Sequence, residues 1–373
     1  MTLYLFNPEH DLALASGLSN FTSPHAGRQL HSDLCYLPAL WAEPGDAVLV
    51  DDVECAMSGL RKLKLKRRIS VSTLADSTSA DIILLRPSQV ATFFQRHAEA
   101  TVSCWGWDKT IAATLRRMGV PADKLPSDAQ LDQIRLLSNR SLAVELLARL
   151  AAIPSTSGHS VVCHTIDGIH AYLADNHKIV VKAPWSSSGR GVRYLTDGAI
   201  DQNVSRWMHN TIQHQHTLIA ERYCDKVRDF AMEYTIDAQG KAHYAGLSLF
   251  DTMSGAYTGN LLMSEEEKEE IIHRYVSPAT LLHISDEIVA FLEQHVAPHY
   301  SGALGVDMMV CRAETEKATE LGETKNFTIN PCVEINLRST MGHVALALSH
   351  QGQRGAMAID YDGHHYKFIV HSS

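Results

Sequence analysis

Short apolar runs alternate with polar or helical stretches through the first third of the chain. Four such runs, LYLFN, DAVLVDD, ADIILLRP and ATVSCWGW, predict strands at 3–7, 46–52, 80–87 and 100–107. Helices are expected between the strands, at 30–41 and 89–97. Strands that alternate with helices are typical of a parallel α/β domain. We therefore predict such a domain over residues 1–125, where Pro121 and Pro126 mark its end.

Polar loops follow the strands of this predicted sheet, at 7–11, 86–88 and 105–109. In parallel sheets, ligands bind at the carboxyl ends of the strands, so these three segments are candidate binding loops. Asp11 has an alternative interpretation as a cap of the helix that follows it.

The pattern changes after residue 126. Leucine and isoleucine positions 131, 134, 137, 142, 146 and 150 recur at helical spacing. Apolar strands are then predicted at 159–166, 177–185 and 218–224, followed by a hairpin over 228–250 that turns at Asp237–Gly240. Ser264 and Glu267 have capping-box spacing for a helix running to about Tyr275. A further helix is expected at 285–295, before a final strand pair at 302–310 and 333–337 joined by an acidic connection.

Charge and cysteine content narrow the class of protein. The chain carries 42 acidic and 33 basic residues, a balance that disfavours nucleic acid as a partner. The basic run at 61–68 is interpreted as a solvated surface. Seven cysteines are scattered without a CxxC pair, which argues against a disulfide framework or structural zinc and favours reduced thiols in the cytoplasm. No apolar run approaches the ~20 residues that span a bilayer, and the N-terminus is interpreted as a strand rather than a signal peptide.

Three oxygen-bearing side chains mark a candidate metal site. Glu334 and Asn336 are two residues apart on a predicted strand, so they point to the same face. If the preceding strand pairs antiparallel with this one, Asp307 lies near Glu334. Carboxylate and amide oxygens suit Mg²⁺. The alternative is that Glu334 and Asn336 simply face solvent.

A lysine and a small-residue loop mark a candidate phosphate site. Lys182 ends the apolar run IVVK, and SSSGRGV follows at 186–192. Backbone N–H groups of such a loop can surround phosphate oxygens. The GK[ST] ending of a Walker loop is absent, and serine-glycine loops are also common turns.

The strand LIAERYC is the candidate adenine site, because its backbone groups can pair with a base while apolar side chains cover the faces of the ring. Glu221 would be its polar anchor, and Asp229 is a further candidate acid on the same lobe. Both residues have an alternative interpretation as surface carboxylates.

In this order, the segments resemble the ATP-grasp superfamily over roughly residues 127–350. The resemblance implies that ATP phosphates are contacted by Lys182 and by the loop residues Ser186, Ser187, Ser188, Gly189 and Gly191. It implies that adenine lies on the hinge Glu221, Arg222, Tyr223 and Cys224. Asp229 stands beside the usual position of the ribose-binding acid. Arg140 takes the place of a second phosphate-facing lysine, which keeps the charge in a bulkier, forked group.

The same resemblance assigns the metal side and the fold. It implies that Asp307, Glu334 and Asn336 bind two Mg²⁺ ions and that Arg338 faces the acyl phosphate or the acceptor. The expected fold class is mixed α/β and α+β. An ATP-grasp fold over 126–373, with lobes at 126–219 and 220–373, would follow a Rossmann-like parallel α/β (pre-ATP-grasp) domain that contributes substrate contacts.

The activity that the resemblance implies is an ATP- and Mg²⁺-dependent ligation of a small-molecule carboxylate to an amine or another nucleophile. It proceeds through an acyl phosphate and releases ADP and phosphate. Mn²⁺ is an expected substitute for Mg²⁺, and the resemblance allows a homodimer. Two alternatives stay open: a small-molecule kinase on the same architecture, and a nucleotide-binding protein without turnover. A Rossmann dehydrogenase is disfavoured, because no GxGxxG follows the first strand.

Overall fold

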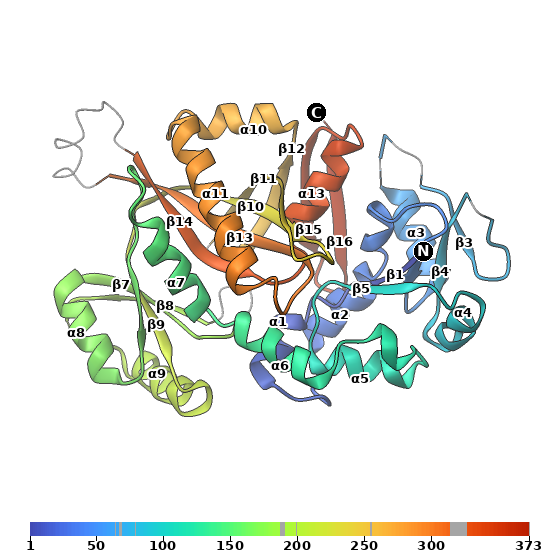
Figure 1. The fold of residues 1–373 in the computed structure, drawn as a ribbon, viewed down its shortest axis with the longest axis horizontal. Helices are drawn as coiled ribbons and strands as arrows, with labels where there is room; N and C mark the ends of the chain where they lie inside the picture. The colour runs from blue at the N-terminus through green and yellow to red at the C-terminus, as the bar shows by residue number, and fades with distance from the viewer. Residues whose placement is uncertain are drawn as a thin grey trace. The chain divides into compact units, whose positions relative to one another are not determined.

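The computed structural model describes residues 1–63, 65–66, 69–78, 80–186, 191–198, 200–253, 256–313 and 327–372. Its contacts divide the chain into two compact units. Unit 1 comprises Met1–Arg135, Thr258–Ser264 and Leu337–Ser373, and unit 2 comprises Leu136–Tyr257 and Glu265–Asn336. Figure 1 labels the helices and strands of both units.

A five-stranded sheet with the order β3-β4-β2-β1-β5 forms the centre of unit 1. Its strands are β1 (Thr2–Leu5), β2 (Ala47–Leu49), β3 (Val71–Thr73), β4 (Ile82–Leu85) and β5 (Thr101–Cys104). Every neighbouring pair in this sheet is parallel. This arrangement confirms the predicted parallel α/β fold. The sequence analysis does not predict β3, whose three residues are a short run after a basic stretch.

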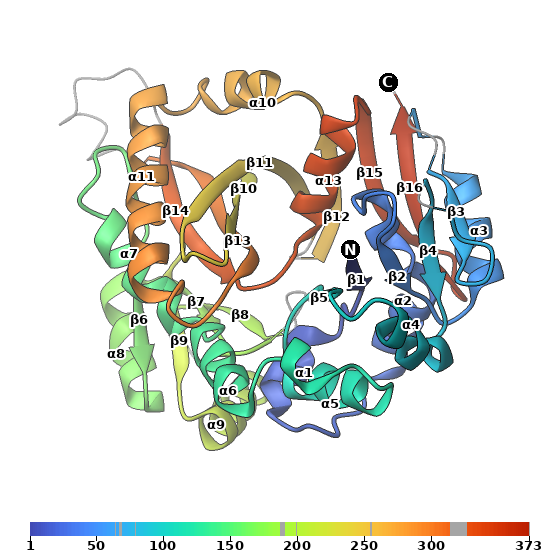
Figure 2. The same cartoon turned by 45° about the vertical axis from the view of Figure 1, so that its right-hand side comes forward.

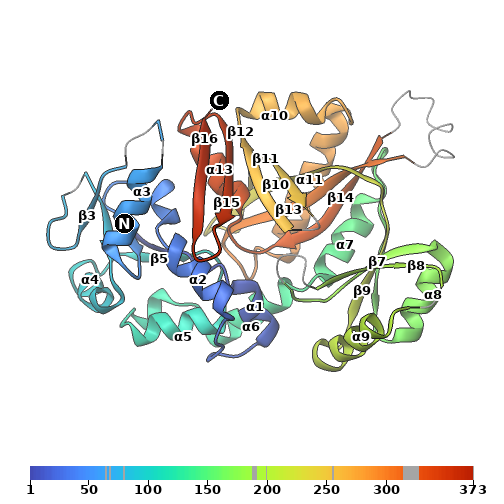
Figure 3. The same cartoon turned by 180° about the vertical axis from the view of Figure 1, so that it is seen from behind.

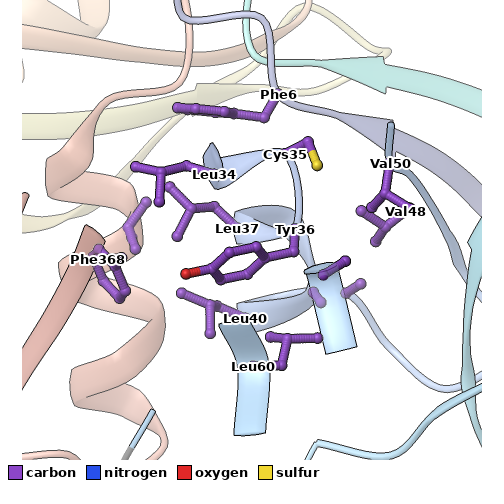
Figure 4. Close-up of a cluster of buried hydrophobic side chains, with 14 of the residues drawn as sticks. Phe6, Leu34, Cys35, Tyr36, Leu37, Leu40, Val48, Val50, Leu60 and Phe368 are labelled. Carbon is purple, nitrogen blue, oxygen red and sulfur yellow. The ribbon is translucent and has the colours of Figure 1, made fainter. Parts of the chain in front are cut away.

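Both faces of the parallel sheet are buried, as is usual for such sheets. Leu3 and Leu5 of β1 belong to one apolar cluster, and Phe6 belongs to another on the opposite face. Figure 4 shows the second cluster, which Leu37 shares with Phe368. The last part of the chain therefore packs with the first sheet.

This packing places the unit boundary differently from the predicted division at 125/126. Residues 337–373 belong to unit 1, because Val344, Leu348 and Met357 share the Phe6 cluster. The carboxyl-terminal elements of unit 1 are α13 (Met341–His350), β15 (Gly355–Tyr361) and β16 (Tyr366–Ser372). Strand β12 (Ala256–Leu262), which lies in unit 1 from Thr258 onward, pairs antiparallel with β15, and β15 pairs antiparallel with β16.

In the described part of the chain, seven α-helices lie between Met1 and Leu150. The first five belong to unit 1, the sixth crosses the boundary at Arg135, and the seventh belongs to unit 2. The seven helices are α1 (His10–Ser16), α2 (His25–Leu34), α3 (Val53–Lys62), α4 (Val90–Arg96), α5 (Lys109–Arg117), α6 (Asp128–Leu137) and α7 (Ser141–Leu150). The single helix expected at 30–41 is instead α2 followed by the short 3₁₀ segment Leu37–Leu40. Pro38 explains the break, because proline has no N–H for a helix interior.

The smaller sheet of unit 2 is antiparallel, in the order β6-β9-β7-β8. Its strands are β6 (Ser160–Cys163), β7 (Lys178–Lys182), β8 (Val192–Thr196) and β9 (Leu218–Arg222). The helices α8 (Ile166–Asn176) and α9 (Gln202–Gln215) cover one face (Figure 3). That face buries Ile179, Val181, Leu218 and Ala220. The intervening residues of β7 and β9, including Lys182 and Glu221, therefore point to the opposite face.

The larger antiparallel sheet of unit 2 contains β14-β13-β10-β11. Its strands are β10 (Lys226–Ile236), β11 (Ala242–Met253), β13 (Gly302–Arg312) and β14 (Phe327–Asn336). The hairpin turn predicted at Asp237–Gly240 is confirmed: the Gly240 amide donates to Asp237 O, and Gly240 has a φ of 78°. A left-handed φ is a conformation that glycine adopts without strain.

Helices cover one face of this larger sheet. They include α10 (Glu265–Ile272) and α11 (Pro278–His295), both of which pack against β11 (Figure 2). Tyr234 of β10 lies 3.3 Å from the Ser285 hydroxyl of α11. The helix expected at 285–295 begins earlier, because the Ser277 side chain caps the Thr280 amide and Pro278 occupies the first turn.

None of the helices in the described part of the chain is long and apolar enough to cross a membrane.

Candidate functional site

The strands β13 and β14 bring the three predicted metal ligands together. They pair antiparallel, which is the condition under which the sequence places Asp307 near Glu334, with Asp307 directly opposite Glu334 and Gly305 opposite Asn336. Residues directly opposite one another project from the same face, and Asn336 is on that face because it lies two residues beyond Glu334. The Asn336 amide donates to the Asp307 carboxylate at 3.0 Å.

The electrostatics of this trio suit a cation. Two carboxylates directly opposite one another in a sheet repel, and the Arg140 guanidinium compensates for Glu334 at 2.6 Å. Asp307, Glu334 and Asn336 are half-buried, and their oxygens suit a hard ion. The chemistry of these three oxygen donors would suit a hard divalent cation such as Mg²⁺.

A buried ion pair occupies the facing part of the smaller sheet. The Lys182 ammonium contacts the Glu221 carboxylate, with side-chain exposures of 9% and 5%. Lys182 and Glu221 are diagonal neighbours on β7 and β9, because Val180 is the residue directly opposite Glu221. Lys182 also donates to the Val333 carbonyl of β14 at 3.1 Å. This last bond ties the lysine to the strand that carries Glu334.

The ion pair and the carboxylates converge around one buried side chain. Burial raises the pKa of the Cys332 thiol, whose charged neighbours are Lys182, Glu221, Asp307 and Glu334. All five residues belong to unit 2. The structure thus brings one cation and three carboxylates, from segments spread over residues 182–334, near a single thiol.

Arg140 links the start of the predicted phosphate loop to the acids. Besides Glu334, it donates to Ala183 O at 2.6 Å and to Ser186 Oγ at 2.7 Å. Ser186 and Gly191 frame the loop, and Ser187, Ser188 and Gly189 lie outside the described residues. Arg140 has 7% of its side chain exposed, so its three contacts hold it in one orientation.

Part of the predicted adenine hinge is already engaged with the protein. The amides of Arg222 and Tyr223 donate to His159 O and Lys178 O. A hydrogen bond with Cys224, together with burial, raises the pKa of the Cys311 thiol. An adenine on this segment would have to pair with other backbone groups, so its position there stays a prediction.

Asp229 lies on the same face of the larger sheet as the metal candidates. It is directly opposite Met309, which is two residues from Asp307 on β13. Its carboxylate accepts hydrogen bonds from Lys226 and from Thr252 Oγ at 2.6 Å. The ribose contact itself stays a prediction.

Arg338 belongs to unit 1. Its guanidinium makes two hydrogen bonds of 2.9 Å to the Asp11 carboxylate, a fork-to-fork geometry that fixes both side chains. Asp11 lies in the first turn of α1 at the carboxyl end of β1. The candidate binding loop 7–11 and the strand end that carries Arg338 therefore meet.

Comparisons with known proteins gave solved structures as matches. No protein-family model and no curated protein matches the chain. It is similar to a Staphylococcus aureus N5-carboxyaminoimidazole synthetase complexed with ADP, with 11% identity over 96% of this chain and 82% of the other, at a TM-score of 0.44. A second match is the biotin carboxylase domain dimer of the Hydrogenobacter thermophilus 2-oxoglutarate carboxylase, in complex with MgADP. It has 12% identity over 84% and 74% of the two chains, at a TM-score of 0.45. A D-alanyl-alanine synthetase A from Vibrio cholerae matches with 13% identity over 68% and 72%, at a TM-score of 0.39.

The sequence analysis missed one residue at the centre of this site. Asn330 is fully buried and donates to the Glu221 carboxylate at 3.2 Å. A signal was present, because Pro331 follows it just before the predicted strand at 333–337, and proline beside or within a strand often marks a bulge.

Proposed function

We propose that this protein is an ATP-grasp enzyme that joins a small-molecule carboxylate to an amine or another nucleophile. ATP with Mg²⁺ would supply the γ-phosphoryl group that activates the carboxylate as an acyl phosphate. We also propose that it works in the cytoplasm, since its seven cysteines are free thiols.

The observation that carries this proposal is that the buried Lys182–Glu221 pair is bonded to Val333 O, next to Glu334, which lies directly opposite Asp307. Phosphoryl transfer to a carboxylate brings two anions together, so catalysis depends on positioned positive charge. Lys182 is such a charge, held by two contacts in a site that is mostly closed to water.

Asp307, Glu334 and Asn336 would hold the metal. Each offers an oxygen from one face of β13 and β14, which supports a rigid site for a small ion. Metal binding at Glu334 would compete with its Arg140 bond, so Arg140 would be released towards the phosphate side, where it already contacts Ser186.

Arg338 is the proposed contact for the acyl phosphate or the acceptor. It lies two residues beyond Asn336, and its bidentate bond to Asp11 supports a fixed orientation. This pairing makes the loop at the carboxyl end of β1 a proposed substrate-binding loop of unit 1, as expected for parallel sheets.

The test is calorimetric titration with a non-hydrolysable ATP analogue, with and without Mg²⁺. Two results together would support the proposal. The wild type should bind the ATP analogue only with Mg²⁺, and Mg²⁺ should have no effect on binding of the analogue by Glu334→Gln. Absence of binding by folded protein, over millimolar analogue, would contradict it.

Turnover then separates ligase from kinase. A ligase releases ADP and phosphate only when both an acid and an acceptor are present. A stable phosphorylated product without a third substrate would contradict the ligase assignment and indicate a kinase.

A further inference from the structure

The strand β14 is interrupted where it passes the buried ion pair. Asp307 is directly opposite Glu334, but Met309, two residues further along β13, is opposite Asn330. Three residues of β14, Pro331, Cys332 and Val333, therefore lie opposite Met308 alone. Proline has no N–H for the ladder, and such bulges re-aim side chains and free backbone groups.

The Asn330 amide fixes this bulge from inside. Its carbonyl oxygen accepts from the Cys332 N–H at 3.3 Å, while its nitrogen donates to Glu221 Oε1 at 3.2 Å. Only one orientation of the amide satisfies both partners, because one is a donor and the other an acceptor. Gly158 packs so closely that a Cβ there would lie 2.9 Å from Asn330 Cγ. The amide is therefore held without room to turn.

Both bonds of Asn330 lead to Lys182. Its nitrogen holds one oxygen of Glu221, whose other oxygen contacts the Lys182 ammonium. Its carbonyl oxygen holds the bulge in which Val333 O accepts from the same ammonium. Each of the two protein groups that fix Lys182 is thus itself oriented by one atom of Asn330.

We propose that Asn330 is a positioning residue that sets the place of the Lys182 ammonium for a nucleotide phosphate. The proposal rests on the proposed function for the identity of the ligand. It rests on the structure alone for the effect of Asn330 on Lys182.

The first experiment measures the affinity of the Mg²⁺-dependent ATP analogue for Asn330→Leu, a substitution of similar volume without polar atoms. We expect at least about tenfold weaker binding, because a buried acceptor loses its donor and the bulge loses its support. Thr328→Val is the matched control: Thr328 is buried on the same strand and loses its 2.8 Å bond to Ser157. We expect its affinity to stay within about twofold of the wild type, at a temperature where both variants are folded. Equal losses in both variants would indicate general damage to the strand and would overturn the proposal.

A double-mutant comparison tests the route of the effect. In the background Lys182→Met with Glu221→Gln, Asn330→Leu should change the affinity by less than about twofold, because residues that act through one another are not additive. A full tenfold loss in that background would show that Asn330 acts elsewhere, and would overturn the proposal.

A second measurement does not depend on any nucleotide. Amine acetylation followed by mass spectrometry reports how freely Lys182 reacts relative to Lys241, whose side chain is 65% exposed. We expect Asn330→Leu to speed acetylation of Lys182 at least about fivefold, since an ammonium released from a buried pair becomes accessible, and Thr328→Val to leave it unchanged. An unchanged Lys182 rate in Asn330→Leu would overturn the positioning role. If the wild type binds no ATP analogue but Lys182 is released as expected, the proposed function fails while the positioning of Lys182 stands.

Discussion

The buried Lys182–Glu221 pair allows a prediction about the free energy of unfolding that does not depend on any ligand. Lys182→Met removes the cation and leaves the Glu221 carboxylate, 5% exposed, without it. Breaking one partner of a buried pair costs about 3–5 kcal/mol, because the remaining charge stays desolvated. Since a typical domain is stable by only about 5–15 kcal/mol, this single substitution should remove a large part of the free energy of unfolding.

Removing both charges should cost much less. In the double variant Lys182→Met with Glu221→Gln, position 221 keeps an oxygen that can accept from Asn330 Nδ2. No unpaired charge is left behind, so we expect a loss below about 2 kcal/mol. The double variant should therefore be more stable than Lys182→Met alone.

Urea unfolding at pH 7, followed by circular dichroism, measures these differences by linear extrapolation. Lys178→Met is the control, because it removes an exposed lysine from the same strand, whose ammonium lies over the Tyr223 ring. We expect that control to lose about 1 kcal/mol or less. A loss below 1 kcal/mol for Lys182→Met, or a double variant no more stable than the single, would refute the reasoning.

Three further predictions concern other parts of the chain. Glu334→Gln should abolish Mg²⁺-dependent turnover, because it removes a charge that the metal needs. It should also lower the midpoint of unfolding while leaving the protein folded, because the Arg140 guanidinium, 7% exposed, loses its carboxylate partner. Turnover at wild-type rates would exclude Glu334 as a ligand. Arg338→Lys should lower kcat by at least about tenfold, since a lysine cannot reproduce the bidentate bond to Asp11, and an ATP-analogue affinity that falls in parallel with kcat would count against its proposed role. Burial favours a higher pKa for Asp33, but hydrogen bonds from His365, Gln29 and the Tyr366 amide outweigh it and lower the pKa below 3.8. A carboxyl group with a lowered pKa stabilises the folded state above pH 4, and this contribution is lost as the pH falls through the folded-state pKa. The stability advantage of the wild type over Asp33→Asn should therefore shrink below pH 4. An advantage that stays constant from pH 7 to pH 2 would contradict this.

The alternation of side chains along strands explains why the arrangement of the candidate metal ligands Asp307, Glu334 and Asn336 could largely be predicted. Side chains alternate along a strand, so the spacing of Glu334 and Asn336 already places them on one face. The nearness of Asp307 depended on an antiparallel pairing that the sequence left as a condition, and the register of β13 and β14 meets that condition. Periodicity also predicted the parallel sheet of unit 1 and the hairpin at Asp237–Gly240.

Partners that are remote in sequence could not be predicted in the same way. Arg140 bonds to Glu334 across 194 positions, and Arg338 to Asp11 across 327. The periodicity of a strand or helix fixes which side of its own element a residue faces, but carries no information about the element packed against it. The contact of the last helix and hairpin with the first sheet is of the same kind, since Phe368 is simply an apolar residue until Leu37 is placed beside it.

The sequence by itself determined the parallel sheet of unit 1 apart from β3, the hairpin at Asp237–Gly240, and the shared face of Glu334 and Asn336, because these depend on local spacing. Only the tertiary structure decided what each charged group contacts. The sequence predicts Lys182 as a cation at the end of a strand, before a small-residue loop, and the structure shows a buried ammonium held by Glu221 and Val333 O. Burying a charge is favourable only when its partners are in place, and those partners come from two other strands, β9 and β14, that folding brings to β7.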